Sequence, residues 1–229
     1  NKVTFTNVDM TTSKDLVVTC GSLSRTYQVS AHIKGSTVTV HIAIRSFLAD
    51  EYLENRTNWY SGYGTSSVSS TEKTRLLGVA SYLRSANSPT TSTETKNYNG
   101  NGPLSQEASG RMIFSEESYV TLNVPASYTV RDALNSFTSN TTYFPNGFAI
   151  TGSDSYIEAM GQTSSNVMGE FDCGSASGWM YTARNSRTDV TSSLPNAGAN
   201  MWPVSDGMYI DWYYTADYGT DFGYSMSDI

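Results

Sequence analysis

Hydrophobic and polar residues alternate strictly in two runs near the start of the chain, over 27–34 and 38–44. A period of two is typical of a strand that buries one face and exposes the other. The runs are separated by Gly35 and Ser36, and glycine accepts the positive φ that a tight turn needs. The pattern therefore predicts an antiparallel hairpin that turns at Gly35-Ser36.

Similar short β-patterned segments recur to the end of the chain. They are 74–84, 111–114, 119–125, 147–151 paired with 155–160, 166–173 paired with 179–184, and 208–217. Long polar connections separate them at 54–73 and 85–110. We expect an all-β fold, an antiparallel β-sandwich or barrel of about ten short strands with long loops.

One segment, 128–137, has helical rather than strand spacing. Thr129 stands three residues before Asp132, as in a capping box. The apolar residues of the segment fall on one helical face: Val130, Ala133, Leu134 and Phe137. We expect this to be the single short helix of the fold.

The aromatic-rich segment near the C-terminus divides into two faces when it is threaded as a strand. One face carries Met208, Ile210, Trp212, Tyr214 and Ala216, and the other carries Tyr209, Asp211, Tyr213, Thr215 and Asp217. We expect Trp212 to lie in the core. Tyr209, Asp211 and Tyr213 remain candidates for ligand recognition.

Composition narrows the classes of partner. Charged residues make up 15% of the 229 positions, against roughly 25% in typical soluble domains. The formal net charge of −7 disfavours nucleic acid and anionic membranes as partners, and no apolar run reaches the roughly 20 residues of a transmembrane helix. We expect residues 1–229 to form one domain cut from a longer chain, with no membrane insertion.

Catalytic and metal-binding motifs are missing from the sequence, which has only two histidines and two cysteines. We therefore expect neither an enzyme nor a cofactor or metal site. The pairing of Cys20 with Cys173 is left open. The best carboxyl pair for glycoside hydrolysis is Glu170 and Asp172, which would share one face of a strand.

Three clusters of aromatic residues remain. Trp59, Tyr60 and Tyr63 lie in a polar loop, Trp179 and Tyr181 lie in "GWMYT", and the third is the C-terminal segment. Rings in a loop cannot all be buried by strand alternation, and exposed amphipathic rings are typical of recognition surfaces. Trp59, Tyr60 and Tyr63 are therefore candidate ligand-binding residues.

The segment "QVSAHIKGSTVTVHIAI", the Ser/Thr/Asn-rich loops and the terminal "MYIDWYYTADY" together resemble the receptor-binding spike and fibre-head domains of non-enveloped viruses, such as astrovirus capsid spikes and adenovirus fibre heads. The resemblance implies a homo-dimeric or homo-trimeric domain on the virion surface that attaches the particle to a host glycan or protein receptor. Two alternatives are a secreted carbohydrate-active enzyme or carbohydrate-binding module, and a structural subunit of a bacterial or archaeal surface.

If the loop around Trp59 is a recognition surface, replacing that ring removes contact area without disturbing a core. We expect Trp59→Ala to weaken binding in a glycan-array or cell-binding assay while the thermal unfolding midpoint stays unchanged. Retained binding would reject this loop as the site.

Overall fold

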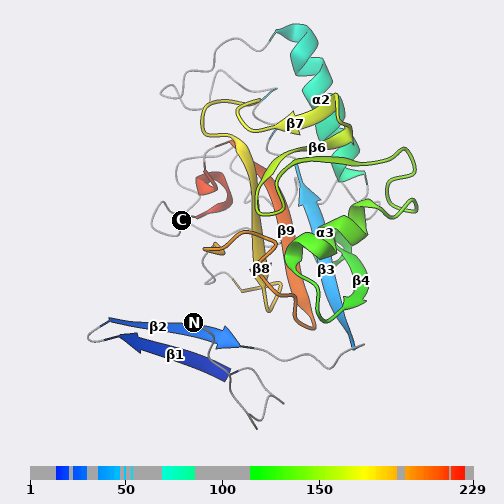
Figure 1. Cartoon of the computed structure of the whole chain (residues 1–229). Helices are drawn as coiled ribbons and strands as arrows, with labels where there is room; N and C mark the ends of the chain where they lie inside the picture. Colours follow the sequence, from blue (N-terminus) through cyan, green and yellow to red (C-terminus); the bar gives the residue numbers. More distant parts are fainter. Residues whose placement is uncertain are drawn as a thin grey trace. The chain divides into compact units, whose positions relative to one another are not determined.

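The computed structural model describes residues 14–20, 23–29, 36–46, 49, 53, 69–85, 114–189, 194–216 and 218–224. The chain divides into two compact units, Asn1–Ser36 and Thr37–Ile229. In the first unit, β1 (Lys14–Cys20) and β2 (Leu23–Val29) form an antiparallel hairpin (Figure 1).

A four-stranded sheet with the order β4-β3-β9-β8 forms the centre of the second unit. Its strands are β3 (Thr37–Arg45), β4 (Val120–Pro125), β8 (Gly178–Arg184) and β9 (Met208–Thr215). The two outer pairs are antiparallel, whereas β3 and β9 run parallel in the middle. The sheet is therefore mixed.

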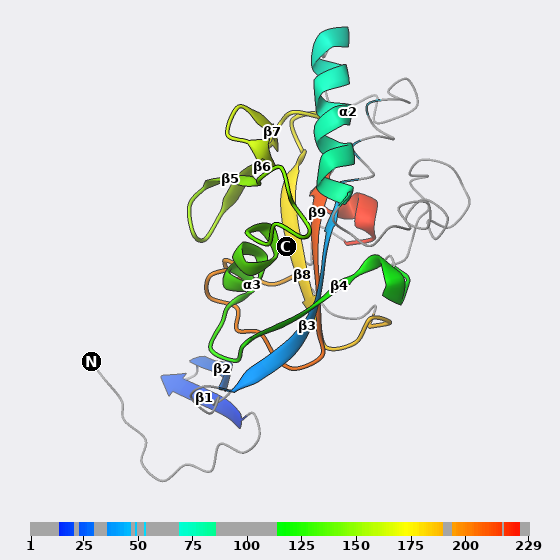
Figure 2. The same ribbon diagram turned by 90° about the vertical axis from the view of Figure 1, so that its right-hand side faces the viewer.

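A second, three-stranded antiparallel sheet and two helices cover one face of this central sheet. The smaller sheet has the order β5-β6-β7, with β5 (Ala149–Gly152), β6 (Ile157–Thr163) and β7 (Asn166–Gly169). The helices are α2 (Ser70–Arg84) and α3 (Val130–Thr138). Figure 2 shows α3 and this sheet on one side of β9, with the 3₁₀ turns η3 (Glu116–Ser118) and η4 (Thr220–Phe222) on the other.

The mainly-β character expected from the sequence is confirmed, but a ten-stranded antiparallel sandwich is not. The described residues form nine strands in three sheets, and one central pair is parallel. The predicted helix is confirmed as α3, because Thr129 and Asp132 complete a reciprocal capping box at its N-terminus. The segment 119–125 is confirmed as a strand, as is the pairing of β5 with β6.

The strand prediction for 74–84 is wrong, because these residues belong to helix α2. Its buried residues are Leu76, Val79, Ala80 and Leu83, which follow the i, i+3, i+4, i+7 spacing of a helix. The side chain of Ser69 accepts a hydrogen bond from the Glu72 N–H and caps the first turn. The fold therefore has a second helix.

Two predicted hairpins are also wrong. β2 pairs with β1, and β3 pairs with β4 and β9, so β3 has other partners than the strand predicted to precede Gly35-Ser36. β7 pairs with β6 and β8 pairs with β9, while residues 170–177 between β7 and β8 form turns. Alternation along a segment identifies a strand, but its partner depends on contacts far away in the sequence.

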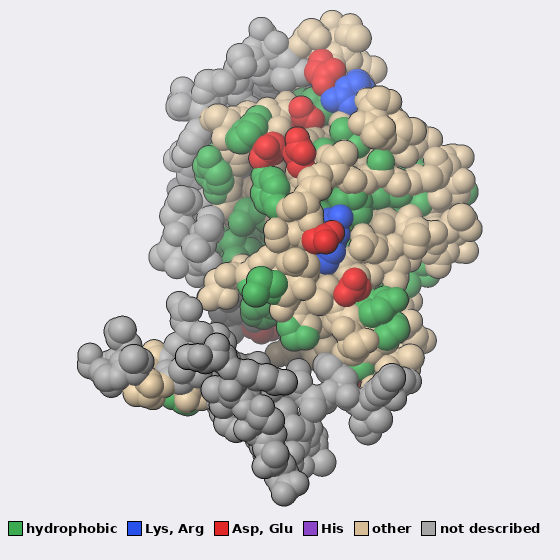
Figure 3. Space-filling view, viewed as in Figure 1, with side chains coloured by type: hydrophobic (Ala, Val, Ile, Leu, Met, Phe, Trp, Pro, Cys, Tyr) green, Lys and Arg blue, Asp and Glu red, His purple; other side chains and the backbone are tan. Residues whose placement is uncertain are grey.

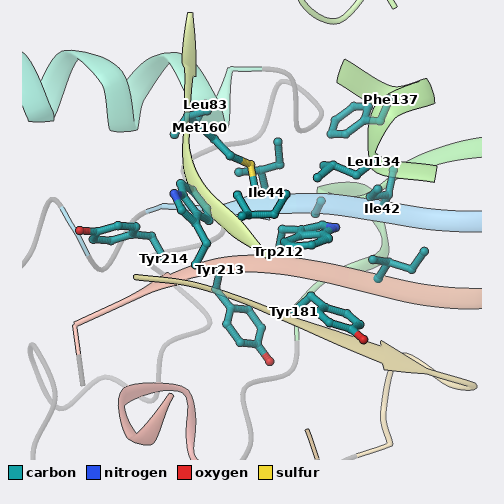
Figure 4. Close-up of a cluster of buried hydrophobic side chains, with 14 of the residues drawn as sticks. Ile42, Ile44, Leu83, Leu134, Phe137, Met160, Tyr181, Trp212, Tyr213 and Tyr214 are labelled. Atoms are coloured by element: carbon teal, nitrogen blue, oxygen red, sulfur yellow. The ribbon is translucent and has the colours of Figure 1, made fainter. Parts of the chain in front are cut away.

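Strand β9 is buried on both of its faces. Trp212 is 2% exposed and packs among Ile42, Ile44 and Leu134 in the core, as predicted (Figure 4). On the opposite face Asp211 and Tyr213 are also buried, and the Tyr213 ring stacks on Phe222 of η4 at 4.0 Å between centroids.

The carboxylate of Asp211 is the centre of a buried charged cluster. It accepts hydrogen bonds from Arg45 Nε at 2.9 Å, from an Arg184 guanidinium nitrogen at 2.6 Å and from the Tyr119 hydroxyl at 3.0 Å. Burial alone would raise the pKa of Asp211, but the two guanidinium charges outweigh it and hold that pKa below its usual value. These residues come from β9, β3, β8 and the position just before β4, so the cluster joins all four strands.

We expect Asp211→Asn to lower the free energy of unfolding by roughly 3–5 kcal/mol, because two buried guanidinium groups lose their counter-charge. In the wild-type protein, the stabilisation that the ionised Asp211 carboxylate contributes should also be lost on acidification. Since the folded pKa is depressed, this stabilisation is present above the unfolded pKa of about 3.9 and is lost as the pH falls below it. Urea unfolding at several pH values measures both effects.

The matched control is Asp154→Asn, which makes the same chemical change at an exposed position. It should change the free energy of unfolding by no more than about 0.5 kcal/mol. An equally small effect of Asp211→Asn would contradict a central role for the cluster.

Candidate functional site

A pocket of about 170 Å³ opens beside the start of β6. Three separate segments enclose it: the turn 155–157, strand β8 and the loop 194–199, with Trp212 of β9 completing the wall. Its lining residues are Ser155, Tyr156, Ile157, Trp179, Met180, Tyr181, Leu194, Pro195, Ala197, Gly198, Ala199 and Trp212. We call it the aromatic pocket.

Three buried rings make its inner wall rigid. Tyr181 and Trp212 stand opposite each other on adjacent strands and stack with centroids 5.1 Å apart. The Trp179 indole N–H donates to the Met168 carbonyl oxygen at 2.8 Å, which fixes that ring against β7. Cross-strand aromatic pairs of this kind stabilise a sheet and hold each ring in one orientation.

The loop wall of the pocket is anchored at several points. The Tyr181 hydroxyl donates to the Ala197 carbonyl oxygen at 2.6 Å. At the first turn of α3, the Val130 N–H donates to the Trp202 carbonyl at 2.9 Å and the Arg131 N–H donates to the Ala199 carbonyl at 3.0 Å. N–H groups in the first turn of a helix have no hydrogen-bond partner within that helix. The carbonyls of the loop accept hydrogen bonds from two of these groups in α3, and these bonds also hold the loop in place.

Tyr156 forms the outer rim and is 50% exposed. It ends a tight turn in which the Ser153 N–H donates to the Tyr156 carbonyl at 2.9 Å. The turn begins at Gly152, whose φ is 107° and where a Cβ atom would lie 2.7 Å from the Glu158 nitrogen. Only glycine fits there without displacing the chain. Gly152 therefore allows the tight turn that places Tyr156 at the rim.

A hydrogen bond to Glu170 holds the phenol of Tyr156 in place. Its hydroxyl donates to Glu170 Oε2. That hydrogen bond, followed by partial burial and the negative charge of Glu170, raises the pKa of Tyr156 to about 12. Tyr156 is therefore a neutral hydrogen-bonding group at physiological pH.

Among the described residues that line the aromatic pocket, none has an acidic or basic side chain. The surface seen in Figure 3 is similar in character, with hydrophobic and uncharged polar groups over most of the described face and charged groups in a few places. Moving an ion into such an environment costs free energy unless it is paired. The pocket therefore suits an uncharged ligand.

Glu170 and Asp172 do not share the face of a strand, because residues 170–173 form a turn in which Phe171 has a φ of 67°. The carboxylate of Glu170 binds Tyr156, whereas Asp172 Oδ2 accepts from the Gly169 N–H at 2.7 Å and lies 3.9 Å from Arg75. Burial raises the pKa of Asp172, although the Gly169 N–H and Arg75 act in the opposite direction. The two carboxyls are thus directed to different partners.

The sequence candidates for recognition lie in several places. Trp59, Tyr60 and Tyr63 fall outside the residues that the structure describes. Asp211 and Tyr213 are each no more than 2% exposed and belong to the core of the central sheet.

Tyr209 lies nearer the surface but its polar group and its ring are both engaged. Its hydroxyl donates to Glu116 Oε2 at 2.8 Å, and its ring stacks on His41 at 4.3 Å between centroids. Glu116 also lies 3.4 Å from His41 Nδ1 and 3.5 Å from Arg187 Nε. Tyr209 therefore belongs to a polar cluster on the face of the sheet opposite the aromatic pocket.

Sequence reasoning noticed the cluster of Trp179 and Tyr181 but did not find Tyr156. Alternation along 155–160 indicates a strand, but it does not indicate that the ring of Tyr156 lies at the rim of a pocket. The glycine at 152, followed by two serines and an aspartate before an aromatic residue, is the local signal that was available.

Within the described part of the chain, no helix has the length and apolar character to span a membrane, and no group of three or more His, Cys, Asp or Glu side chains is arranged to hold a metal ion. No protein-family model, no curated protein and no solved structure matches the chain.

The Tyr156–Glu170 hydrogen bond predicts a measurable titration. In Glu170→Gln the acceptor loses its negative charge, so we expect the pKa of Tyr156 to fall from about 12 toward the ordinary tyrosine value of about 10. Carbon-13 NMR of labelled tyrosine rings, with Tyr156→Phe to assign the signal, measures it. An unchanged pKa would contradict this contact.

Proposed function

We propose that this protein is a receptor-attachment domain, a non-enzymatic binding module that holds an uncharged sugar residue in the aromatic pocket. The observation that carries the proposal is a cavity with stacked aromatic walls, a half-exposed tyrosine at its rim and no charged side chain among the described lining residues. Pockets that bind small molecules typically combine apolar walls with a few convergent polar groups. Here these groups are the hydroxyls of Tyr156 and Ser155.

The size of the pocket favours a single ring over a large ligand. At about 170 Å³, it is smaller than the roughly 300–1,000 Å³ of pockets that enclose drug-sized molecules. The apolar face of a pyranose ring can pack on aromatic carbon, while its hydroxyls reach the polar groups at the rim. A net charge of −7 further favours a neutral sugar over a sialylated or sulphated one.

Binding is a better match to the geometry than hydrolysis. Glycoside cleavage needs two carboxyl groups facing one another across the scissile bond, about 5–10 Å apart. The carboxylate of Glu170 is bound to Tyr156 at the rim, and Asp172 faces the Gly169 N–H and Arg75. Neither carboxyl is among the lining residues.

The setting that we propose is a virion surface, where the domain acts as a spike or fibre head that attaches the particle to a host cell. The support is the low fraction of charged residues and the hydroxyl-rich composition that the chain has in common with such domains. A spike of this kind is a homo-dimer or homo-trimer. Several copies on one particle would convert weak single-site binding into strong attachment.

The proposal predicts that neutral monosaccharides and their oligomers bind the purified chain on a glycan array and in calorimetric titrations. We expect Tyr156→Ala to weaken binding about tenfold, corresponding to loss of a contact worth roughly 1.4 kcal/mol. The unfolding midpoint should stay close to that of the wild type, because the ring is half exposed.

Met201→Ala is the matched control, since Met201 is 72% exposed and is not among the lining residues. It should leave binding unchanged. The proposal is wrong if no neutral sugar binds the wild-type chain, or if Tyr156→Ala binds as tightly as Met201→Ala does.

A further inference from the structure

We propose that the ligand is a chain of neutral sugar residues that leaves the aromatic pocket and continues over the exposed rings of Phe171 and Tyr218. This inference rests on the proposed function, because it extends the same site. It adds a second contact surface and predicts that the protein prefers oligosaccharides to single sugars.

The backbone of these two residues is the first observation. Phe171 has a φ of 67° and Tyr218 a φ of 48°, and among the described residues they are the only non-glycine positions with a positive φ. Bulky side chains rarely adopt this conformation because Cβ crowds the backbone, which costs free energy. Glycine would make both turns without that cost.

Burial does not compensate for the strain. Phe171 is 61% exposed and Tyr218 is 45% exposed, so neither ring gains what a core aromatic gains from leaving water. A large exposed ring at a position where glycine would be more stable indicates that the ring serves binding and not folding. Strained backbone conformations are commonly found at ligand-contacting sites.

The two rings belong to turns that are bonded to each other. The turn at 170–177 is closed by the Phe171 N–H, which donates to the Ser177 carbonyl at 3.0 Å. Tyr218 is joined to the same turn twice, because its N–H donates to the Ala176 carbonyl at 3.1 Å and its hydroxyl donates to the Ser175 carbonyl at 3.3 Å. Both rings are therefore held by one rigid piece of backbone.

The same turn connects to the rim of the pocket. Glu170, the residue before Phe171, accepts the hydrogen bond from the Tyr156 hydroxyl. Hydrogen bonds and the chain between them thus link Tyr156 at the pocket rim through Glu170 to Phe171, and the same turn through Ser175 to Tyr218. We call these three exposed rings, Tyr156, Phe171 and Tyr218, the aromatic strip.

The chemistry of the aromatic strip favours a glycan as the occupant. Exposed rings on two turns that are bonded to each other can contact the flat faces of sugar rings in a polymer. The carboxylate of Glu170 and the backbone carbonyls are acceptors for sugar hydroxyls. The negative charge of Glu170 beside the strip disfavours an anionic glycan. Continuity with a pocket of single-ring size gives the chain a place for its terminal residue.

The test compares short and long ligands on the full chain. Glucose, mannose, galactose and N-acetylglucosamine are titrated by calorimetry together with their linear homo-oligomers up to the hexasaccharide. We expect wild-type affinity to rise at least tenfold between the monosaccharide and the preferred oligomer. In Phe171→Gly the affinity for the oligomer should fall about tenfold, while the affinity for the monosaccharide stays unchanged.

A second readout separates this role from a structural one. Because glycine relieves the left-handed strain, Phe171→Gly should unfold at a higher temperature than the wild type while it binds the oligomer less tightly. Tyr218→Gly should behave in the same way, although loss of its hydroxyl bond to Ser175 reduces the gain in stability. Met201→Ala, which alters an exposed apolar side chain outside the strip, should change neither quantity.

The possible results separate the two proposals. In one outcome, monosaccharides bind in a Tyr156-dependent manner while oligomers bind no more tightly; in another, Phe171→Gly leaves oligomer affinity intact. Either result overturns the inference about the aromatic strip and leaves the proposed sugar site in the pocket standing. If no neutral sugar binds at all, both proposals fail. Oligomer binding that is lost in Phe171→Gly together with a lower unfolding temperature would also overturn the inference, because the ring would then be structural.

Discussion

The carboxylate of Asp211 holds the central sheet together from within. Its two guanidinium partners come from β3 and β8, and its tyrosine partner immediately precedes β4. A buried ion cluster is a weak source of net stability, but removing the Asp211 carboxylate takes a counter-charge away from two buried guanidinium groups. These three contacts require β3, β8 and β9 to lie in the observed register.

The candidate site depends on the same strand. Trp212 follows Asp211 and points to the opposite face, where it packs on Tyr181 and closes the aromatic pocket. Fixing Asp211 therefore also fixes the wall of the pocket. The outer parts are supported differently, because a glycine turn places Tyr156 and the N-terminus of α3 holds the loop 194–199. A rigid interior and two supported turns together give a preorganised cavity, which reduces the entropy lost on binding.

Two exposed aromatic residues have a left-handed backbone conformation that destabilises the fold. Phe171 and Tyr218 occupy backbone conformations that suit glycine, yet both present large rings to solvent. Proteins commonly give up some stability where a functional group must be presented in a particular way. The proposed path of a glycan across these rings links that local strain to the uncharged side chains described in the pocket wall and to the low fraction of charged residues in the chain.

The sequence by itself determined the features that depend on near neighbours. The capping box of Thr129 and Asp132 and the apolar face that follows it are enough to specify α3, and alternation is enough to mark β9 and to place Trp212 inside. Local patterns did not reveal that the polar face of β9 is covered as well, because Arg45 lies 166 positions from Asp211 in sequence. The tertiary structure alone decided the partners of the strands and the turn at Phe171 that separates Glu170 from Asp172. It also decided how three separate segments assemble the aromatic pocket. The physical reason is that charge pairing and burial act between groups close in space, whatever their separation along the chain.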